Sequence, residues 1–68
     1  MNLAQYDGKA VKVTMTTGEV FMGVCEVSSA EFNECEYGEK EDSLDLGGFN
    51  GWKIYASQIA SVELLKNE

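Results

Sequence analysis

An alternation of apolar and polar residues on both sides of Gly18 constrains the fold of this chain more than any other feature. In the run 10–16, apolar residues occupy every second position, a period that is typical of a half-buried β-strand. The run 19–27 continues with apolar residues on both faces, and Gly18 can adopt the positive φ that a tight turn requires. The sequence therefore predicts a β-hairpin.

The register of this hairpin has two possible forms. A two-residue turn would bring the even-numbered residues 20 to 24 to the apolar face of the first strand. A three-residue turn with a left-handed Gly18 would bring the odd-numbered residues 21 to 25 there, because a one-residue slip exchanges the two faces. We favour the second form, since Gly23 inside a strand indicates a bend, and a small closed barrel needs sharp curvature.

Shorter segments on either side complete the expected secondary structure. Residues 43–46 and 52–56 alternate as strands, and the Asn50-Gly51 pair between them is a strong hairpin signal. Leu3 and Tyr6 follow Asn2 at helical spacing, which predicts one helical turn ending at Asp7-Gly8. Residues 28–42 are polar, acidic and aperiodic, so we expect a long acidic loop or a ragged hairpin end.

The tail, residues 57–65, fits two structures. Ile59, Val62 and Leu65 have helical spacing, and Ser57 could cap a helix. Ala60, Val62 and Leu64 alternate as a strand instead. The pattern alone leaves both open.

Size and charge limit the possible functions. The 68 residues form one domain, whose core is marginal on its own. With two cysteines and no histidine, self-association is the expected aid to stability. The net charge of −7 is local, because residues 31–45 hold seven acids and one lysine. Arginine is absent, which disfavours binding to the phosphate backbone of a nucleic acid. DNA is therefore not expected as a partner. We see no signal peptide and no membrane segment, and therefore expect a cytoplasmic protein with no membrane partner.

Two sets of residues have a familiar spacing. The first comprises Leu3, Tyr6, Gly8-Lys9, Val11, Val13, Gly18, Phe21 and Gly23; the second comprises Ile54-Tyr55-Ala56-Ser57-Gln58-Ile59 and then Val62-Glu63. They resemble the two motifs of the Sm and Sm-like (LSm) family, and together they cover nearly the whole chain. The chain is especially similar to short acidic bacterial LSm-domain proteins, in which an acidic loop precedes a Ser-Ile or Ser-Leu strand, here Ser43-Leu44.

The resemblance implies an all-β fold, a short N-terminal helix followed by five strongly bent antiparallel strands in an SH3-like (Sm-like) barrel. It decides the tail in favour of a strand. It also implies homo-oligomeric rings, in which the fourth strand of one protomer pairs with the fifth of the next. Such pairing would cover exposed strand edges through heterologous contacts.

Sm rings usually bind single-stranded RNA near the pore, so the resemblance implies RNA as a ligand and Asn33, Lys53 and Tyr55 as candidate RNA-binding residues. When Ser29-Ala30-Glu31-Phe32-Asn33 is laid on the family's base-contacting motif, Asn33 takes the place of its asparagine. The family's Arg-Gly falls on Tyr55-Ala56, so the cation is lost while Tyr55 could stack on a base. If the third strand begins at Ser43 instead, Asn33 lies in an insertion and the correspondence fails; we favour this second alignment.

The remaining charged residues and the cysteines do not indicate a functional site. Lys9, Lys12 and Lys53 are too few for a persuasive anion patch. The acidic run lacks the alternation and the glycine of an EF-hand loop, so we expect a solvated charge run and no metal. Cys25 and Cys35 could pair only if a tight hairpin were centred near Ala30, and buried inert thiols are the favoured interpretation. With no histidine and no arginine, we expect neither catalysis nor a cofactor.

These observations define one expectation: a homo-oligomeric binding or assembly module with RNA as its implied ligand, or alternatively a protein scaffold that does not bind nucleic acid. Trp52 and Phe49 are expected to cover an end or an interface. The expected barrel lining is Val11, Val13, Phe21, either Val24 or Cys25, Leu44, Leu46, Ile54, Ile59 and Val62.

Overall fold

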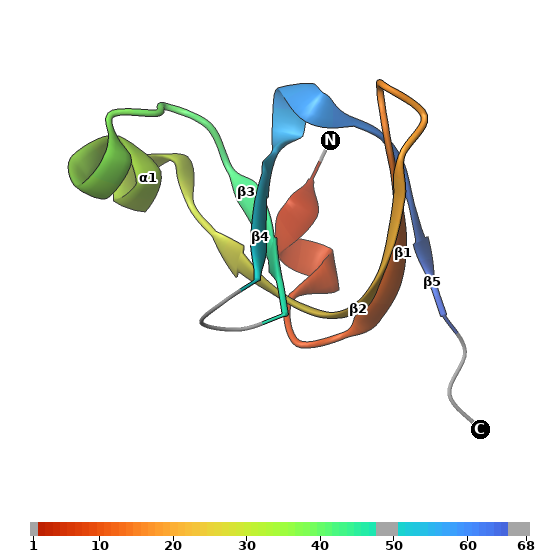
Figure 1. The fold of residues 1–68 in the computed structure, drawn as a ribbon. Helices are drawn as coiled ribbons and strands as arrows, with labels where there is room; N and C mark the ends of the chain where they lie inside the picture. The colour runs from red at the N-terminus through yellow and green to blue at the C-terminus, as the bar shows by residue number, and fades with distance from the viewer. Residues whose placement is uncertain (1, 48–50, 66–68) are drawn as a thin grey trace.

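The computed structural model describes residues 2–47 and 51–65, which form one five-stranded antiparallel sheet, one α-helix and two short 3₁₀ helices (Figure 1). In chain order the elements are η1 (Leu3–Tyr6), β1 (Ala10–Met15), β2 (Val20–Ser28), α1 (Ala30–Tyr37), β3 (Ser43–Leu46), β4 (Trp52–Tyr55), η3 (Ala56–Gln58) and β5 (Ile59–Leu64). The strand order is β4-β3-β2-β1-β5. The predicted β-rich class and the short N-terminal helix are confirmed.

The β1–β2 hairpin has the three-residue turn that we favoured. Val13 pairs with Phe21 and Val11 with Gly23. The Met15 N–H donates to the Glu19 carbonyl at 2.8 Å, and Gly18 adopts a φ of +96°. A side chain at Gly18 would be strained by this conformation, which explains why a glycine ends the turn.

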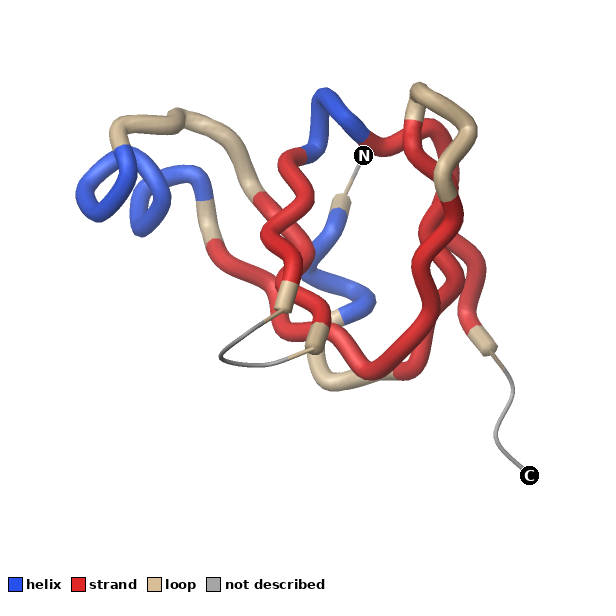
Figure 2. The backbone as a smooth tube through the Cα atoms, viewed as in Figure 1, coloured by secondary structure: helices blue, strands red, loops and turns tan. Residues whose placement is uncertain are grey.

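Strand β2 bends so strongly that its two halves pair with different strands. Residues 20–24 pair with β1 and residues 25–28 with β3. Gly23 lies just before the change of partner, as the bend predicted from its glycine requires. Figure 2 shows the sheet curling around η1, whose Leu3 side chain is fully buried.

The core lies inside this curl and matches most of the expected lining. Its buried apolar residues are Leu3, Val11, Val13, Cys25, Leu44, Leu46, Ile54 and Ile59, with Phe21 and Val62 partly buried against them. Of the two alternatives in β2, Cys25 is buried and Val24 is 63% exposed. Trp52 is also 63% exposed, and its ring lies 5.4 Å from that of Phe21 at the rim of the core. Phe49 lies outside the described residues.

The tail is a strand, so the helical alternative is wrong and the choice made from the resemblance is confirmed. β5 pairs with β1, with Val62 opposite Val13. The turn η3 leads into it, and the Thr16 N–H donates to the Gln58 carbonyl at 2.9 Å.

The sheet is not closed into a barrel, which corrects the expected architecture. After β4, η3 carries the chain across to β1, and β5 occupies the outer edge of β1. Within residues 2–47 and 51–65, β4 pairs with β3 alone and β5 with β1 alone. One edge of each of these two strands therefore has no partner strand in the described chain.

The second correction concerns residues 28–42, which we expected to form a loop. They contain α1, which projects from the sheet at the β2–β3 connection (Figure 1). The Ser29 side chain caps the helix by accepting from the Phe32 N–H at 3.1 Å, and Gly38 ends it with a φ of +77°. The Ala30 N–H also donates to Asp42 Oδ1 at 2.7 Å. These polar caps stabilise a helix that has no apolar periodicity.

The β3–β4 hairpin forms as expected, with Leu44 opposite Ile54. β4 ends at Tyr55, one residue before the expected limit, because Ala56 begins η3. Asn50, the first residue of the predicted turn pair, lies outside the described residues.

Candidate functional site

The outer face of the sheet, opposite the core, carries polar side chains that the strand register brings together. Asp45 of β3 is paired with Glu26 of β2 on one side and with Lys53 of β4 on the other. Ser28 and Ser43 are paired two positions further along, so they share this face. Helix α1 reaches the same region through Asn33, whose amide donates to Ser43 Oγ at 3.1 Å, and both residues are fully buried.

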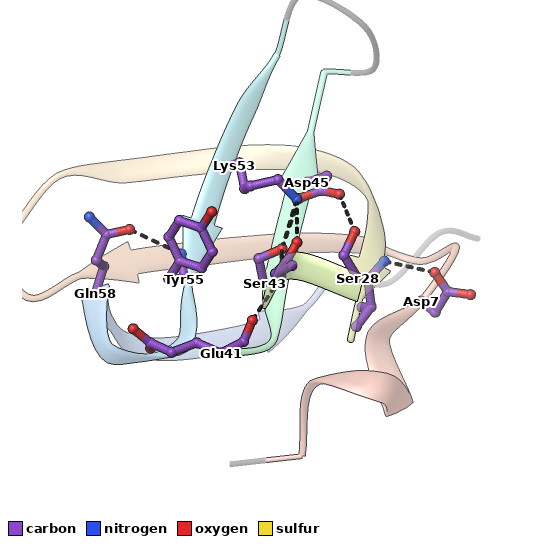
Figure 3. A network of polar contacts seen from close by, with 10 residues as sticks. Asp7, Ser28, Glu41, Ser43, Asp45, Lys53, Tyr55 and Gln58 are labelled. Atoms are coloured by element: carbon purple, nitrogen blue, oxygen red, sulfur yellow. Dashed lines mark hydrogen bonds and ion pairs between the residues drawn. The ribbon is translucent and has the colours of Figure 1, made fainter. Parts of the chain in front are cut away.

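Lys53 is the centre of a hydrogen-bonded group that we call the Lys53 cluster, consisting of Asn33, Ser43, Asp45 and Lys53. Figure 3 shows Ser43, Asp45 and Lys53 of this cluster. The Lys53 ammonium donates to Asn33 Oδ1 at 3.0 Å, to Ser43 Oγ at 3.2 Å and to Asp45 Oδ1 at 3.0 Å. All three of its N–H donors are therefore used. Its nitrogen also lies 4.9 Å from the centre of the Tyr37 ring, within cation–π range.

The other members of the Lys53 cluster are equally well paired. The Asn33 amide donates to the Glu41 carbonyl at 2.7 Å and to Ser43 Oγ at 3.1 Å. The Ser43 hydroxyl donates to Asp45 Oδ1 at 3.1 Å, and the Ser28 hydroxyl donates to Asp45 Oδ2 at 2.7 Å. Among the described residues, no buried side-chain nitrogen or oxygen lacks a partner. The cluster therefore fastens α1 to the sheet.

An open groove of about 920 Å³ lies between α1 and the outer face of the sheet. Aromatic side chains from the helix, Phe32 and Tyr37, line it together with Val24 of β2 and Trp52 of β4. The Phe32 and Tyr37 rings meet edge to face, with their centres 6.3 Å apart. Polar lining comes from Glu26, Ser28, Asp45 and Lys53, so the groove combines apolar side chains with one ion pair and one further acid.

Two of the three predicted RNA-binding residues belong to the Lys53 cluster. Asn33 lies in α1 with its amide fully engaged, and Lys53 lies opposite Asp45 in β4. Tyr55 ends β4, is half-buried, and its N–H donates to Gln58 Oε1 at 3.0 Å. Strand β3 begins at Ser43, which is the start that the favoured alignment assumes, and Asn33 lies before it in α1. The role of these three residues in RNA binding stays a prediction.

Val24, Phe32 and Tyr37 were not predicted as groove residues, because no apolar pattern in the sequence indicated the helix. The usable signals were polar: Ser29 three residues before Phe32, and Gly38 directly after Tyr37, which together are typical of a capped helix. The sequence allowed two registers for the β1–β2 hairpin, and only the observed register places Val24 on the outer face of the sheet.

Several acids have structural partners, among them Glu41 of the acidic run that we expected to be solvated. Glu41 accepts from the Ser57 N–H at 2.9 Å and from its hydroxyl at 3.1 Å, at the start of η3. Asp7 accepts from the Val27 N–H at 2.9 Å. In the part of the chain that the structure describes, no group of three or more His, Cys, Asp or Glu residues is arranged to hold a metal ion.

The two cysteines are free thiols in different surroundings, so only half of the predicted burial is confirmed. Cys25 is buried and its thiol donates to the Tyr6 carbonyl at 3.1 Å. Burial raises the pKa of the Cys25 thiol, because the thiolate would lose its hydration, and Asp7 and Asp45 raise it further. Cys35 is exposed on α1, which corrects the expectation that both thiols are buried.

Taken together, the fold and the site define a small, open, antiparallel β-sheet protein with one helix fastened to its outer face by a polar cluster. Searches against protein-family models, curated proteins and solved structures found no match. Of the helices in the described residues, none has the length and apolar character needed to cross a membrane.

Proposed function

We propose that this protein is an Sm-like homo-oligomeric assembly module, in which β4 of one copy pairs with β5 of the next. The observation that carries the proposal is the sheet order β4-β3-β2-β1-β5, which leaves one edge of β4 and one edge of β5 without a partner strand in the described chain. An unpaired edge presents N–H and C=O groups that can pair with another chain.

Apolar side chains at both edges support this proposal. Trp52 on β4 is 63% exposed and Leu64 on β5 is 53% exposed. A chain of 68 residues buries a small core, so a neighbour that covers such residues adds stability that the single chain lacks. Because two different edges would meet, the contact is heterologous, and repetition of it closes a ring when the rotation per copy permits.

The ligand that the resemblance implies, single-stranded RNA, has less support than a protein scaffold without nucleic acid. Asn33 and Lys53 use their polar atoms on each other and on their neighbours in the Lys53 cluster. Tyr55 is only half-buried, which is compatible with stacking on a base. The acidic excess around α1 also repels phosphates.

The assembly is tested by native mass spectrometry and sedimentation of the intact chain, with one edge variant and one matched control. We expect a particle whose mass is a multiple of 7.5 kDa. Leu64→Lys places a charge on the edge strand β5 and should yield monomers. Met22→Lys adds the same charge at a comparably exposed position, 65% exposed, on the interior strand β2 and should leave the assembly intact.

Two results would contradict the proposal. A monomer at the highest attainable concentration removes edge pairing altogether. Dissociation by Met22→Lys but not by Leu64→Lys moves the interface from the strand edges to the outer face of β2.

RNA binding is tested separately with labelled oligo-U and oligo-A at two salt concentrations. Tight binding that weakens with salt would favour the RNA function over the scaffold, and absence of binding at micromolar protein would remove it. Tyr55→Ala should abolish any binding that depends on base stacking, while Tyr37→Ala should not.

A further inference from the structure

We propose that the groove between α1 and the outer face of the sheet is a docking site for a basic peptide segment of another protein, one that carries lysine or arginine together with apolar anchor residues. The groove lies within a single chain, so this proposal does not need edge-to-edge assembly, and Trp52 is an exposed apolar residue that both proposed surfaces share.

Exposed apolar surface is concentrated in the groove. Val24 and Trp52 are each 63% exposed, Tyr37 is 59% exposed and Phe32 is 49% exposed. These are half of the eight large apolar side chains that are exposed in the described part of the chain, and all four line one concavity of about 920 Å³. Single exposed apolar residues are ordinary, but a contiguous group in a hollow indicates a binding surface.

The groove also lies in a negatively charged part of the molecule. Glu26 lines the groove as an unpaired acid, while Asp45 and Lys53 of the lining form an ion pair at 3.0 Å. Helix α1, which contributes Phe32 and Tyr37 to the lining, also carries Glu31, Glu34 and Glu36. The one lysine in the lining is Lys53, whose three donors are already used by its cluster. The field at the groove is therefore negative and open to cationic side chains from outside. Aromatic walls also suit a guanidinium or ammonium group, which is attracted to the face of a ring.

The same charge argues against a second copy of this chain, or a nucleic acid, as the occupant. The full chain carries twelve acids and five lysines, so another copy would bring mostly acidic surface to an acidic groove. A phosphate backbone would meet the same repulsion. Of the possible partners, a basic segment is the one whose charge complements the site.

Contacts within the chain also hold the aromatic residues of the groove in place. Tyr37 is held by its contact with Lys53 at 4.9 Å and by the Phe32 ring at 6.3 Å. The Lys53 cluster fixes the helix from which both aromatic residues project. A preformed site loses less entropy when a partner docks.

Trp52 makes the experiment direct, because it is the chain's single tryptophan and lines the groove. The probe is a synthetic, blocked peptide in which lysine alternates with leucine and phenylalanine. We expect a saturable change in tryptophan fluorescence that weakens with added salt, and one peptide per protomer by native mass spectrometry. Peptides with glutamate in place of lysine, or serine in place of the apolar residues, should not produce it.

Matched variants on one strand locate the binding. Val24→Ser removes an apolar contact from the groove and should weaken binding about tenfold. Val20→Ser makes the same change on the same face of β2 outside the groove lining and should leave binding unchanged. Both sites are exposed, and urea unfolding of each variant verifies that the fold is kept. Phe32→Ala on α1 should weaken binding to a similar extent.

The proposal is overturned by any of three results. The first is no fluorescence change at saturating peptide and no peptide-bound species. The second is equal binding of the glutamate peptide. The third is equal weakening by Val24→Ser and Val20→Ser.

Discussion

At the scale of single residues, Lys53 makes the contacts that connect the helix to the sheet. Lys53 lies on β4, which follows α1 and β3 in the sequence. Its ammonium donates to Asn33 of α1 and to Ser43 and Asp45 of β3. The side chains of Lys53 and Asp45 are only 23% and 27% exposed, so their attraction is screened less than that of a surface pair. The charge is thus a structural element of the fold.

Replacement of this lysine should destabilise the protein strongly. Lys53→Met keeps most of the side-chain volume but leaves the Asp45 carboxylate and Asn33 Oδ1 without their shared donor. We expect a loss of about 2 kcal/mol in the free energy of unfolding, below the value for a fully buried pair because both side chains keep some contact with water. Urea unfolding followed by circular dichroism measures it.

A double-mutant cycle separates the pair from its surroundings. Adding Asp45→Asn to Lys53→Met removes the unpaired carboxylate and should restore about 1 kcal/mol. Lys9→Met, at an exposed lysine, should change stability by less than about 0.5 kcal/mol. Equal losses from Lys9→Met and Lys53→Met would show that Lys53 has no special role.

Cys25 gives the stability a definite dependence on pH. Its thiol pKa is raised above the ordinary value of 9.0 by burial. Above the unfolded pKa, the unfolded chain therefore binds fewer protons at this residue than the folded one, and stability must fall as pH rises. The contribution is fully present below pH 9.0 and is lost as pH rises through the folded pKa.

Urea unfolding at several pH values above and below 9.0 tests this effect. The wild-type chain should lose stability on the alkaline side, and Cys25→Ala should remove the part due to this thiol. Cys35→Ser should keep the wild-type slope, because Cys35 is exposed. A slope that disappears in Cys35→Ser and survives in Cys25→Ala would contradict the assignment.

At the scale of elements, sequence patterns predicted the strands and failed at the helix. The strands alternate because one face packs on the core, and that alternation is local: Val11 and Val13 are both fully buried two residues apart. Helix α1 turns a buried asparagine, Asn33, toward the sheet. No apolar period marks it, because its attachment depends on Lys53, twenty residues later in the chain.

The candidate site was accordingly only half predictable. Strand alternation indicated which residues of 43–46 and 52–55 share a face. It contained no information that Ser43, Asp45 and Lys53 would meet an asparagine from residues 28–42. The open edge of the sheet was equally hidden, because it depends on how η3 directs the chain from β4 toward β1.

Since α1 lacks an apolar face, its caps should matter more than usual. Ser29→Ala removes the acceptor of the Phe32 N–H and should lower the free energy of unfolding by about 1 kcal/mol. Gly38→Ala should cost a similar amount, about 1 kcal/mol, from the left-handed backbone alone, since the space beside Gly38 is open. Far-ultraviolet circular dichroism and urea unfolding measure both.

The control for the glycine is Gly38→Asn. Asparagine tolerates the left-handed conformation better than alanine, so this variant should lie between alanine and glycine in stability. An alanine variant as stable as the wild type would show that the helix does not depend on its C-terminal stop.

At the scale of the whole molecule, the acidic surface acts on the two proposed associations in opposite directions. Each protomer carries a net charge of −7, so a ring of identical copies repels itself, whereas the same field attracts a basic peptide to the groove. Salt screens both effects. It should therefore strengthen the assembly of copies while it weakens peptide docking.

Sedimentation from about 0.05 M to about 0.5 M sodium chloride tests the first half, since the screening length falls below about 10 Å over this range. We expect the apparent dissociation constant of the assembly to fall about threefold to tenfold, a change of about 1 kcal/mol per contact between copies. Glu34→Gln with Glu36→Gln removes two exposed charges from α1 and should reduce the salt effect without abolishing edge pairing. Dissociation at high salt would mean that attraction between opposite charges holds the copies together. A contact made by the backbone groups of β4 and β5 has no such attraction, so this result would contradict edge pairing.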